Sequence, residues 1–241
     1  MMTQPEIGSV AGITTAAGLA AGAWFYAALY PRSQIFGRVI VSGSDPAELA
    51  LTYDDGPNPV ATPRLLDLLA KHDVRATFFL IGEFVRREPA LAREIAAAGH
   101  VIGNHTMTHP WLAWQTASRI RSEMAGASAA IEDAIGLPVT LFRPPHGARR
   151  PVVLRVAREL GLSTIQWNII THDWRVQPGE AIAGKVRAGI RRNQARGRGS
   201  NILLHDGGMD QPRIPTIEAT GTIIAEAKSS GRRFVTADAW V

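Results

Sequence analysis

The chain has 241 residues, of which 46% are hydrophobic and 20% charged, a composition typical of a folded globular protein rather than a disordered one. It contains no cysteine, which excludes disulfide bonds and thiolate metal sites, so any metal ion must be held by His, Asp or Glu. The net charge of +5 favours anionic partners. Solvated helix faces are the simplest interpretation of the arginine runs. Among specific partners we expect an anionic membrane surface rather than nucleic acid, because no aromatic residues are interleaved with the arginines.

The first segment of the chain is apolar, since Ile7 to Tyr30 contains no charged side chain and ends in aromatic residues. About 20 apolar residues can cross a bilayer, and aromatic residues collect at its interfaces. We therefore expect residues 1–45 to hold a membrane anchor and a linker, with an apolar helix packed on the protein and a cleaved signal peptide as alternatives. Arg32 and Arg38 follow the segment, and by the positive-inside rule they favour the cytoplasmic face for the next domain.

From residue 46 onward, strand-like runs alternate with amphipathic stretches of helical spacing, and a glycine follows several of these stretches where a left-handed residue ends a helix. This alternation predicts parallel strands with crossover helices, in either an open doubly wound sheet or a closed barrel. The expected strands are Leu49–Tyr53, Ala76–Ile81, Val101–Gly103, Val139–Phe142, Thr164–Ile170, Ile202–Leu204 and Arg233–Thr236, and the expected helices cover residues 61–72, 88–98, 115–135, 150–160, 179–193 and 215–229.

Polar residues follow five of the strand-like runs. In a barrel the carboxyl ends of the strands converge on one rim, where catalytic groups sit, whereas a doubly wound sheet spreads them along a line. We therefore predict an α/β domain over residues 46–241, a distorted (β/α) barrel of about seven strands preceded by an apolar N-terminal helix. The polar residues are Asp54 and Asp55, His105 and His109, Arg143, Asp173, and His205.

The first two polar groups suggest a metal site. Adjacent carboxylates at the end of a buried strand lose solvation and repel each other, and a bound cation relieves one of them while the other is free to act as a base. Taken alone, Asp54-Asp55-Gly56 is better explained as a turn. His105 and His109 are four positions apart and can face the same ion. One Asp and two His leave a position open for water, as catalytic metal sites do.

The remaining polar positions would complete an active site. Arg143 is a fixed cation that could orient a carboxylate base, and the prolines of its loop leave the backbone N–H of His146 free to bind an oxyanion. Asp173 stands beside the apolar Trp174, and His205 could protonate a leaving amine. His205 alone is better explained as a structural histidine, but the combination at five successive strand ends predicts a hydrolase.

These motifs, in this order, resemble those of the polysaccharide deacetylase family, also called the NodB-homology or carbohydrate esterase family 4 domain. The resemblance extends from about Glu48 to Trp240 and implies a domain that removes an N-acyl group, expected to be acetyl, from an amino-sugar glycan or glycolipid. The matching motifs are Asp54-Asp55, His105-x3-His109, Arg143-Pro-Pro-x-Gly147, Asp173-Trp174 and Leu203-x-His205.

The resemblance also implies a role for each residue. Asp54 would be the catalytic base and His205 the general acid. Asp55, His105 and His109 would bind a divalent metal, expected to be zinc, with cobalt, nickel, manganese and iron as alternatives.

The other implied roles concern positioning and substrate. Arg143 would hold the base and Asp173 would tune the acid. The substrate would contact Pro145, His146, Trp174 and Leu203, and the last two of these would line a pocket for the acyl methyl group.

Three positions depart from the family pattern. Tyr53 replaces the usual Phe, His146 stands where Tyr is common, and Ile170 replaces the first Asp of an Asp-x-x-Asp-Trp pattern. We expect activity to survive these changes. Two alternatives stay open: deformylation or deacetylation of a membrane lipid-linked amino sugar, and glycan binding without catalysis. The second is disfavoured, because binding alone needs neither the base nor the acid.

Overall fold

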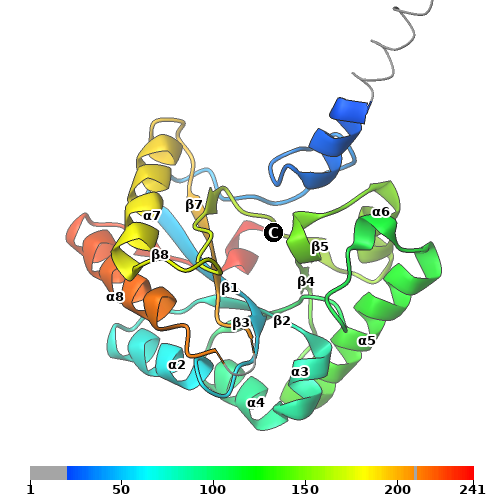
Figure 1. Cartoon of the computed structure of the whole chain (residues 1–241), viewed down its shortest axis with the longest axis horizontal. Coiled ribbons are helices and arrows are strands. Elements are labelled where there is room, and N and C mark those ends of the chain that lie inside the picture. Colours follow the sequence, from blue (N-terminus) through cyan, green and yellow to red (C-terminus); the bar gives the residue numbers. More distant parts are fainter. Residues whose placement is uncertain (1–20, 209–210) are drawn as a thin grey trace, which may run out of the picture.

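The structure, a computed structural model, describes residues 21–208 and 211–241. A parallel sheet, curled into a half-barrel, lies at the centre of the molecule (Figure 1). Its strands run in the order β5-β4-β3-β2-β1-β7-β6, and β8 pairs with β1 outside this path. The strands are β1 (Glu48–Gly56), β2 (Thr77–Leu80), β3 (Val101–Asn104), β4 (Leu141–Phe142), β5 (Ser163–Thr164), β6 (Ile169–Ile170), β7 (Ser200–His205) and β8 (Arg233–Phe234).

Helices surround the sheet and cover its outer face (Figure 1). Both faces of β1 are buried, as expected of a strand inside a parallel sheet. Tyr53 of β1 stacks on Phe78 at 5.2 Å, and its hydroxyl lies 3.0 Å from that of Thr220, which gives the tyrosine a partner that phenylalanine would lack. The helices are α2 (Thr62–Lys71), α3 (Gly82–Arg87), α4 (Pro89–Ala97), α5 (Ala117–Ile135), α6 (Pro151–Glu159), α7 (Gly179–Gln194) and α8 (Ile214–Ser229).

The predicted α/β barrel is confirmed in outline, and six helices lie within two residues of their expected ends. One expected strand, Thr164–Ile170, is wrong. It contains two short strands on opposite edges of the sheet, β5 beside β4 and β6 beside β7, and the residues between them cross from one edge to the other. The short helix α3 was not expected, because six residues are too few to show a helical period.

The N-terminal segment of residues 39–44 contacts both sides of the open half-barrel, next to β5 and just before β7. The N–H of Ile40 donates to the carbonyl of Thr164 at 2.9 Å, and the N–H of Gln166 donates back to Ile40 at 2.7 Å. At the other side the N–H of Gly199 donates to the carbonyl of Gly43 at 3.0 Å. The half-barrel is therefore bridged along this seam by residues that precede its first strand.

A helix over residues 21–29 lies at the edge of the molecule (Figure 1). The first part of the expected anchor, residues 7–20, lies outside the described residues. Within the described part of the chain, no helix is both long and apolar enough to cross a bilayer. The boundary at residue 45 stays a prediction, as does the anchor.

Candidate active site

A cavity of about 500 Å³ opens at the carboxyl ends of the strands, where the sequence predicted that the polar residues would converge. Its position follows from the topology, since β1, β3 and β7 all point their carboxyl ends at this rim. The residues that line it are Asp54, Asp55, His105, His109, Trp111, His146, Trp167, Ile170, Trp174, Leu203 and His205.

Asp55, His105 and His109 form one cluster in this cavity. The Nε2 atoms of His105 and His109 lie 3.4 Å and 3.1 Å from the same oxygen, Oδ1 of Asp55. Burial alone would raise the pKa of Asp55, but the two imidazoles hold it well below its usual value. Three potential ligand atoms, one from the end of β1 and two from the loop after β3, therefore face a common point.

The donor set of this cluster fits a metal ion. His105 Nδ1 lies 2.7 Å from the carbonyl of Arg143, which only accepts, so the tautomer that could bind a metal carries its proton on Nδ1 and directs the lone pair of Nε2 at Asp55. Oδ1 of Asp55 is buried without a hydrogen-bond partner. Ligand atoms around a tetrahedral ion with bonds of about 2.0–2.1 Å lie roughly 3.3 Å apart, close to the observed spacings.

Strained backbone surrounds the cluster. Asp55, Thr106 and His109 have φ values of 71°, 69° and 59°, in a left-handed region that residues other than glycine rarely occupy. The strained turn of residues 105–109 is held locally, because Oδ1 of Asn104 accepts from the N–H of Thr106 and Oγ1 of Thr106 accepts from the N–H of His109. Such strain, held by the surrounding structure, is typical of functional sites.

Asp54 lies beside the cluster and is held from inside the barrel by Arg143. The guanidinium donates to Oδ1 of Asp54 at 2.7 Å and to the hydroxyl of Thr52 at 2.8 Å, and it lies 4.1 Å from the ring centre of Phe79. Arg143 is fully buried, and burial lowers its pKa while the ion pair with Asp54 opposes that change. Oδ2 of Asp54 lies 3.8 Å from Nε2 of His105, so the second oxygen faces the cavity.

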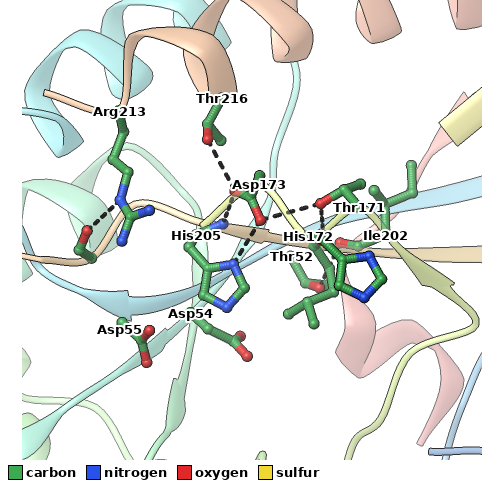
Figure 2. A network of polar contacts seen from close by, with 12 residues as sticks. Thr52, Asp54, Asp55, Thr171, His172, Asp173, Ile202, His205, Arg213 and Thr216 are labelled. Atoms are coloured by element: carbon green, nitrogen blue, oxygen red, sulfur yellow. Dashed lines mark hydrogen bonds and ion pairs between the residues drawn. The ribbon is translucent and has the colours of Figure 1, made fainter. Parts of the chain in front are cut away.

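His205 is held from the other side by Asp173 (Figure 2). Its Nδ1 lies 2.8 Å from Oδ1 of Asp173, and its backbone N–H donates to Oδ2 at 2.8 Å. The hydroxyls of Thr171 and Thr216 also donate to this carboxylate. Burial alone would lower the pKa of His205, but the hydrogen bond and charge of Asp173, with the charges of Asp55 and Asp54, raise it above its usual value.

The loop after β4 carries His146 in a one-turn helix over Pro145–Gly147, where His146 has a φ of 57°. None of the described residues accepts a hydrogen bond from the backbone N–H of His146. Partial desolvation, with the charges of His109 and His105, lowers the pKa of His146 to about 4. Pro145 is buried in this loop and does not line the cavity.

The structure brings Trp174 and Leu203 into the cavity wall as expected, and it adds residues that sequence reasoning missed. Trp111 could have been recognised from the sequence, because it is an aromatic residue only two positions after the metal-ligand candidate His109. Trp167 could not, because it falls within the run that was interpreted as one strand.

A fourth carboxylate, Asp206, was also missed. It lies fully buried behind the turn of Asp54 and Asp55, accepts a hydrogen bond from Thr62, and has no partner for Oδ1 among the described residues. Burial raises the pKa of Asp206 to about 7.

Comparison with known proteins gives consistent matches. The family model described as polysaccharide deacetylase matches residues 42–165. A peptidoglycan-N-acetylglucosamine deacetylase of Bacillus cereus is 37% identical over 190 residues, which are 78% of this chain and 85% of that protein. A chitooligosaccharide deacetylase of Sinorhizobium fredii is 41% identical over 168 residues, which are 69% of this chain and 75% of that protein.

A solved structure is similar to this chain over most of the length of both proteins. The crystal structure of a peptidoglycan N-acetylglucosamine deacetylase in complex with 4-naphthalen-1-yl-N-oxidanyl-benzamide has a TM-score of 0.78 and 33% sequence identity. The match covers 84% of this chain and 91% of that one.

Proposed function

The chain belongs to the polysaccharide deacetylase family, and from this membership and the cavity we propose that it is a metal-dependent hydrolase that removes N-acetyl groups from an amino-sugar glycan. The family resemblance and the deacetylase class expected from the motifs are thereby confirmed. One observation carries the proposal: a three-residue metal-type cluster shares its cavity with a carboxylate held by Arg143 and a histidine held by Asp173.

Asp55, His105 and His109 would hold the ion, which we propose is zinc; cobalt, nickel, manganese and iron also suit a donor set of oxygen and imidazole. When bound, a divalent ion supplies Lewis acidity that polarises the amide carbonyl and lowers the pKa of water. No cysteine is present to act as a nucleophile, and the proposed reaction needs none. The oxygen that adds to the carbonyl carbon comes from water.

The residues of the chain would move the protons. Asp54 accepts a proton from the attacking water through the oxygen that Arg143 leaves free. The backbone N–H of His146 donates to the oxyanion as the carbonyl carbon becomes tetrahedral. His205 then gives its proton to the departing nitrogen, the C–N bond breaks, and acetate and a free amine result. Asp173 holds His205 in place for this step and keeps it protonated to higher pH.

The substrate proposal follows from the relatives and from the cavity wall. The similar proteins are named as deacetylases of peptidoglycan N-acetylglucosamine and of chitooligosaccharide, so we propose a glycan that contains N-acetylglucosamine. Trp174, Leu203 and Ile170 give the cavity an apolar side that suits the acetyl methyl group, and Ile170 removes a charge that the family pattern places there. Deacylation of a lipid-linked amino sugar remains the second candidate, favoured by the apolar segment of residues 7–30.

The proposal is tested by acetate release from N-acetylglucosamine oligomers. Asp54→Asn should lower turnover at least a thousandfold while metal content stays near that of the wild type, because the ligands are unchanged. Asp67→Asn, an exposed carboxylate on α2, is the matched control and should keep full activity. A chelator should abolish acetate release, and zinc should restore it.

Parallel assays separate the alternatives. Formate release, or activity on a lipid-linked amino sugar alone, would favour the second candidate. Failure of the wild-type chain to release acid from any acylated glycan would favour glycan binding without catalysis. Wild-type turnover in Asp54→Asn would overturn the assignment of the base.

We also propose that the chain associates with an anionic membrane surface through its N-terminal side. A second cavity, of about 600 Å³, is lined by Arg32, Arg38, Arg196 and Arg198 and by no acidic residue. Within the described residues none of these arginines has a carboxylate partner. The helix of residues 21–29, which leads to Arg32, exposes several apolar side chains, among them Phe25, Tyr26 and Leu29.

Sedimentation of the full chain with lipid vesicles tests this association. Binding should increase with the fraction of phosphatidylglycerol in phosphatidylcholine vesicles and decrease with salt. The double variant Arg38→Glu/Arg198→Glu should bind more weakly, whereas Arg86→Glu/Arg87→Glu on α3 should bind like the wild type. Equal binding of both double variants would contradict a role for the arginine-lined cavity. The side of the membrane stays a prediction from Arg32 and Arg38.

A further inference from the structure

Trp111 presents a large aromatic surface at the mouth of the catalytic cavity. Its side chain lines the cavity, yet the residue is 45% exposed. Exposing so large an apolar group to water has a free-energy cost unless something covers it during function. Trp114, three positions later, is 65% exposed but does not line the cavity and lies against Trp24 instead, with ring centres 5.6 Å apart. The two tryptophans therefore differ in what they face.

The chain holds Trp111 in a fixed orientation. Pro110 precedes it and has a restricted φ. Leu112 follows and is fully buried, and the carbonyl of Trp111 accepts from the N–H of Trp114 at 3.1 Å. The backbone on both sides of Trp111 is thus held in place. The residue therefore loses little conformational entropy when a ligand binds.

The ring of His146 supports the indole. The two rings are stacked, with centres 4.0 Å apart and planes at 15°. The rings of His146 and His109 also pack edge to face, with centres 4.6 Å apart. The stacked pair of Trp111 and His146 therefore contacts a proposed metal ligand. His146 covers one face of Trp111, and the exposed remainder of the indole is available to a ligand. Trp174 and Leu203 form a separate part of the wall beside His205.

We propose that Trp111, supported by His146, is a stacking platform for a pyranose ring of the substrate glycan and thereby a specificity-determining residue. This rests on the proposed function. A pyranose carries an apolar face of C–H groups, and a rigid tryptophan offers apolar area against it at a small entropic cost. The platform would hold a sugar ring beside the proposed metal ligands, because the ring of His146 contacts both Trp111 and His109.

Kinetics with two substrates test the platform. Trp111→Ala should raise KM for an N-acetylglucosamine tetramer about tenfold, the expected loss for one aromatic contact, with a smaller change in kcat. Its kcat/KM for 4-nitrophenyl acetate, which has no pyranose ring, should fall much less. Trp111→Phe should recover most of the tetramer KM, and Trp114→Ala should behave as the wild type on both substrates. Equal losses on the tetramer and the ester would overturn the proposal.

Calorimetry separates this proposal from the proposed function. Tetramer binding is measured to zinc-loaded Asp54→Asn and to Asp54→Asn/Trp111→Ala, with circular dichroism to confirm that both are folded. An affinity about tenfold weaker in the double variant supports the platform even if the wild-type chain releases no acetate. The same affinity in both variants would refute it even if deacetylation is demonstrated.

Discussion

Asp54 and Asp173 are both buried carboxylates, the first lining the cavity and the second lying behind His205, and their partners give them different properties. Asp54 is paired with an arginine, which does not release its proton in a protein. Asp173 is paired with a histidine, which titrates within the physiological range. These partners are consistent with the proposed roles, in which His205 donates a proton and the free oxygen of Asp54 accepts one.

The pH dependence of catalysis should change when Asp173 is replaced, because Asp173 raises the pKa of His205. In the proposed reaction His205 acts as the proton donor, so activity should be lost as pH rises through the raised pKa of this group. Asp173→Asn removes the charge that raises the pKa and leaves the burial that lowers it. The alkaline limb of kcat/KM should therefore move to lower pH by about one unit or more. A profile from pH 6 to 10 measures the shift.

Thr216→Val is the matched control for that profile. It removes a hydroxyl that donates to Oδ2 of Asp173 but leaves the charge in place, so its alkaline limb should move less. If the limb in Asp173→Asn coincided with that of the wild type, His205 would not be the group that titrates there.

At the residue scale, the sequence predicted the polar residues of the cavity and Trp174, but not Trp111 or Trp167. Asp54, His105 and His205 follow strands in a recognisable order, and their chemistry limits what they can do together. Trp167 carries no signal in the sequence, and the position of Trp111 close to His109 is a weak one, because an aromatic residue in a sequence is as easily a core residue. Only the folded chain shows that Trp111 is exposed and that His146 stacks on it.

The proposed base and acid come from neighbouring strands. Asp54 of β1 and His205 of β7 are direct partners in the parallel pair, so the proposed base and acid start from adjacent backbone positions. The loops that leave these strands also lie in contact, and the N–H of Gly207 donates to the carbonyl of Asp54 at 3.2 Å. A Cβ on Gly207 would lie 2.1 Å from Cβ of Asp55 and 2.3 Å from its carbonyl oxygen.

Gly207→Ala should therefore weaken metal binding. The added methyl group meets backbone atoms, which cannot move aside as a flexible side chain can, so the loop of Asp55 must shift. Because ligand atoms tolerate displacements of only about 0.2 Å, we expect metal affinity to fall at least tenfold. Zinc titration against a competing chelator measures this.

Gly184→Ala in α7 provides the comparison, because no atom lies closer than 4.0 Å to the added carbon. It should keep the affinity of the wild type and gain slightly in stability, since alanine favours a helix. Unchanged zinc affinity in Gly207→Ala, with the fold intact, would show that the contact between the two loops does not position Asp55.

At the element scale, six helices and most strands were predictable, but the short helix α3 and the break between β5 and β6 were not. The six long helices and β1 have enough residues to show their period. β5 and β6 have two residues each, and the apolar Ile165 and Trp167 between them make the sequence resemble one continuous strand. The side-chain amide of Asn168 holds this crossing to Gly199 and Asn201, contacts that no local pattern reveals.

Arg149 joins the N-terminal segment to the loop that carries His146. It is almost completely buried, and its guanidinium donates to the carbonyls of Gly147, Tyr30 and Ser33 at 2.8–3.0 Å. Burial lowers the pKa of Arg149 to about 10, which still leaves it charged at neutral pH. One side chain thus ties segments more than 110 positions apart in the sequence.

Arg149→Met should impair both stability and turnover. Several buried carbonyls would lose their donor, and the free energy of unfolding should fall by roughly 3 kcal/mol or more. Because Gly147 follows the N–H proposed to bind the oxyanion, kcat should fall while zinc content stays near that of the wild type. Urea unfolding and acetate release measure the two effects. Arg155→Met, an exposed arginine on α6, should change neither.

At the scale of the whole molecule, the barrel and the position of its cavity could be predicted from the alternation of strands and helices. The packing of residues 39–44 along the seam of the half-barrel could not. Residues 39–44 make too few backbone bonds to form a strand, and Ile40 contributes a single bridge. Their role depends on β5 and β6 ending far enough apart to admit another segment, which only the folded sheet determines.

The seam has a practical consequence for anyone who shortens this protein. A chain that begins at residue 46, where the motifs begin, would lose the acceptors of the Gln166 and Gly199 amides and would open one side of the barrel to water. The smallest piece that folds well should therefore start upstream of Ala28, whose carbonyl accepts from the N–H of Arg149. Tags and fusion partners are better joined before that position than in place of the residues that follow it.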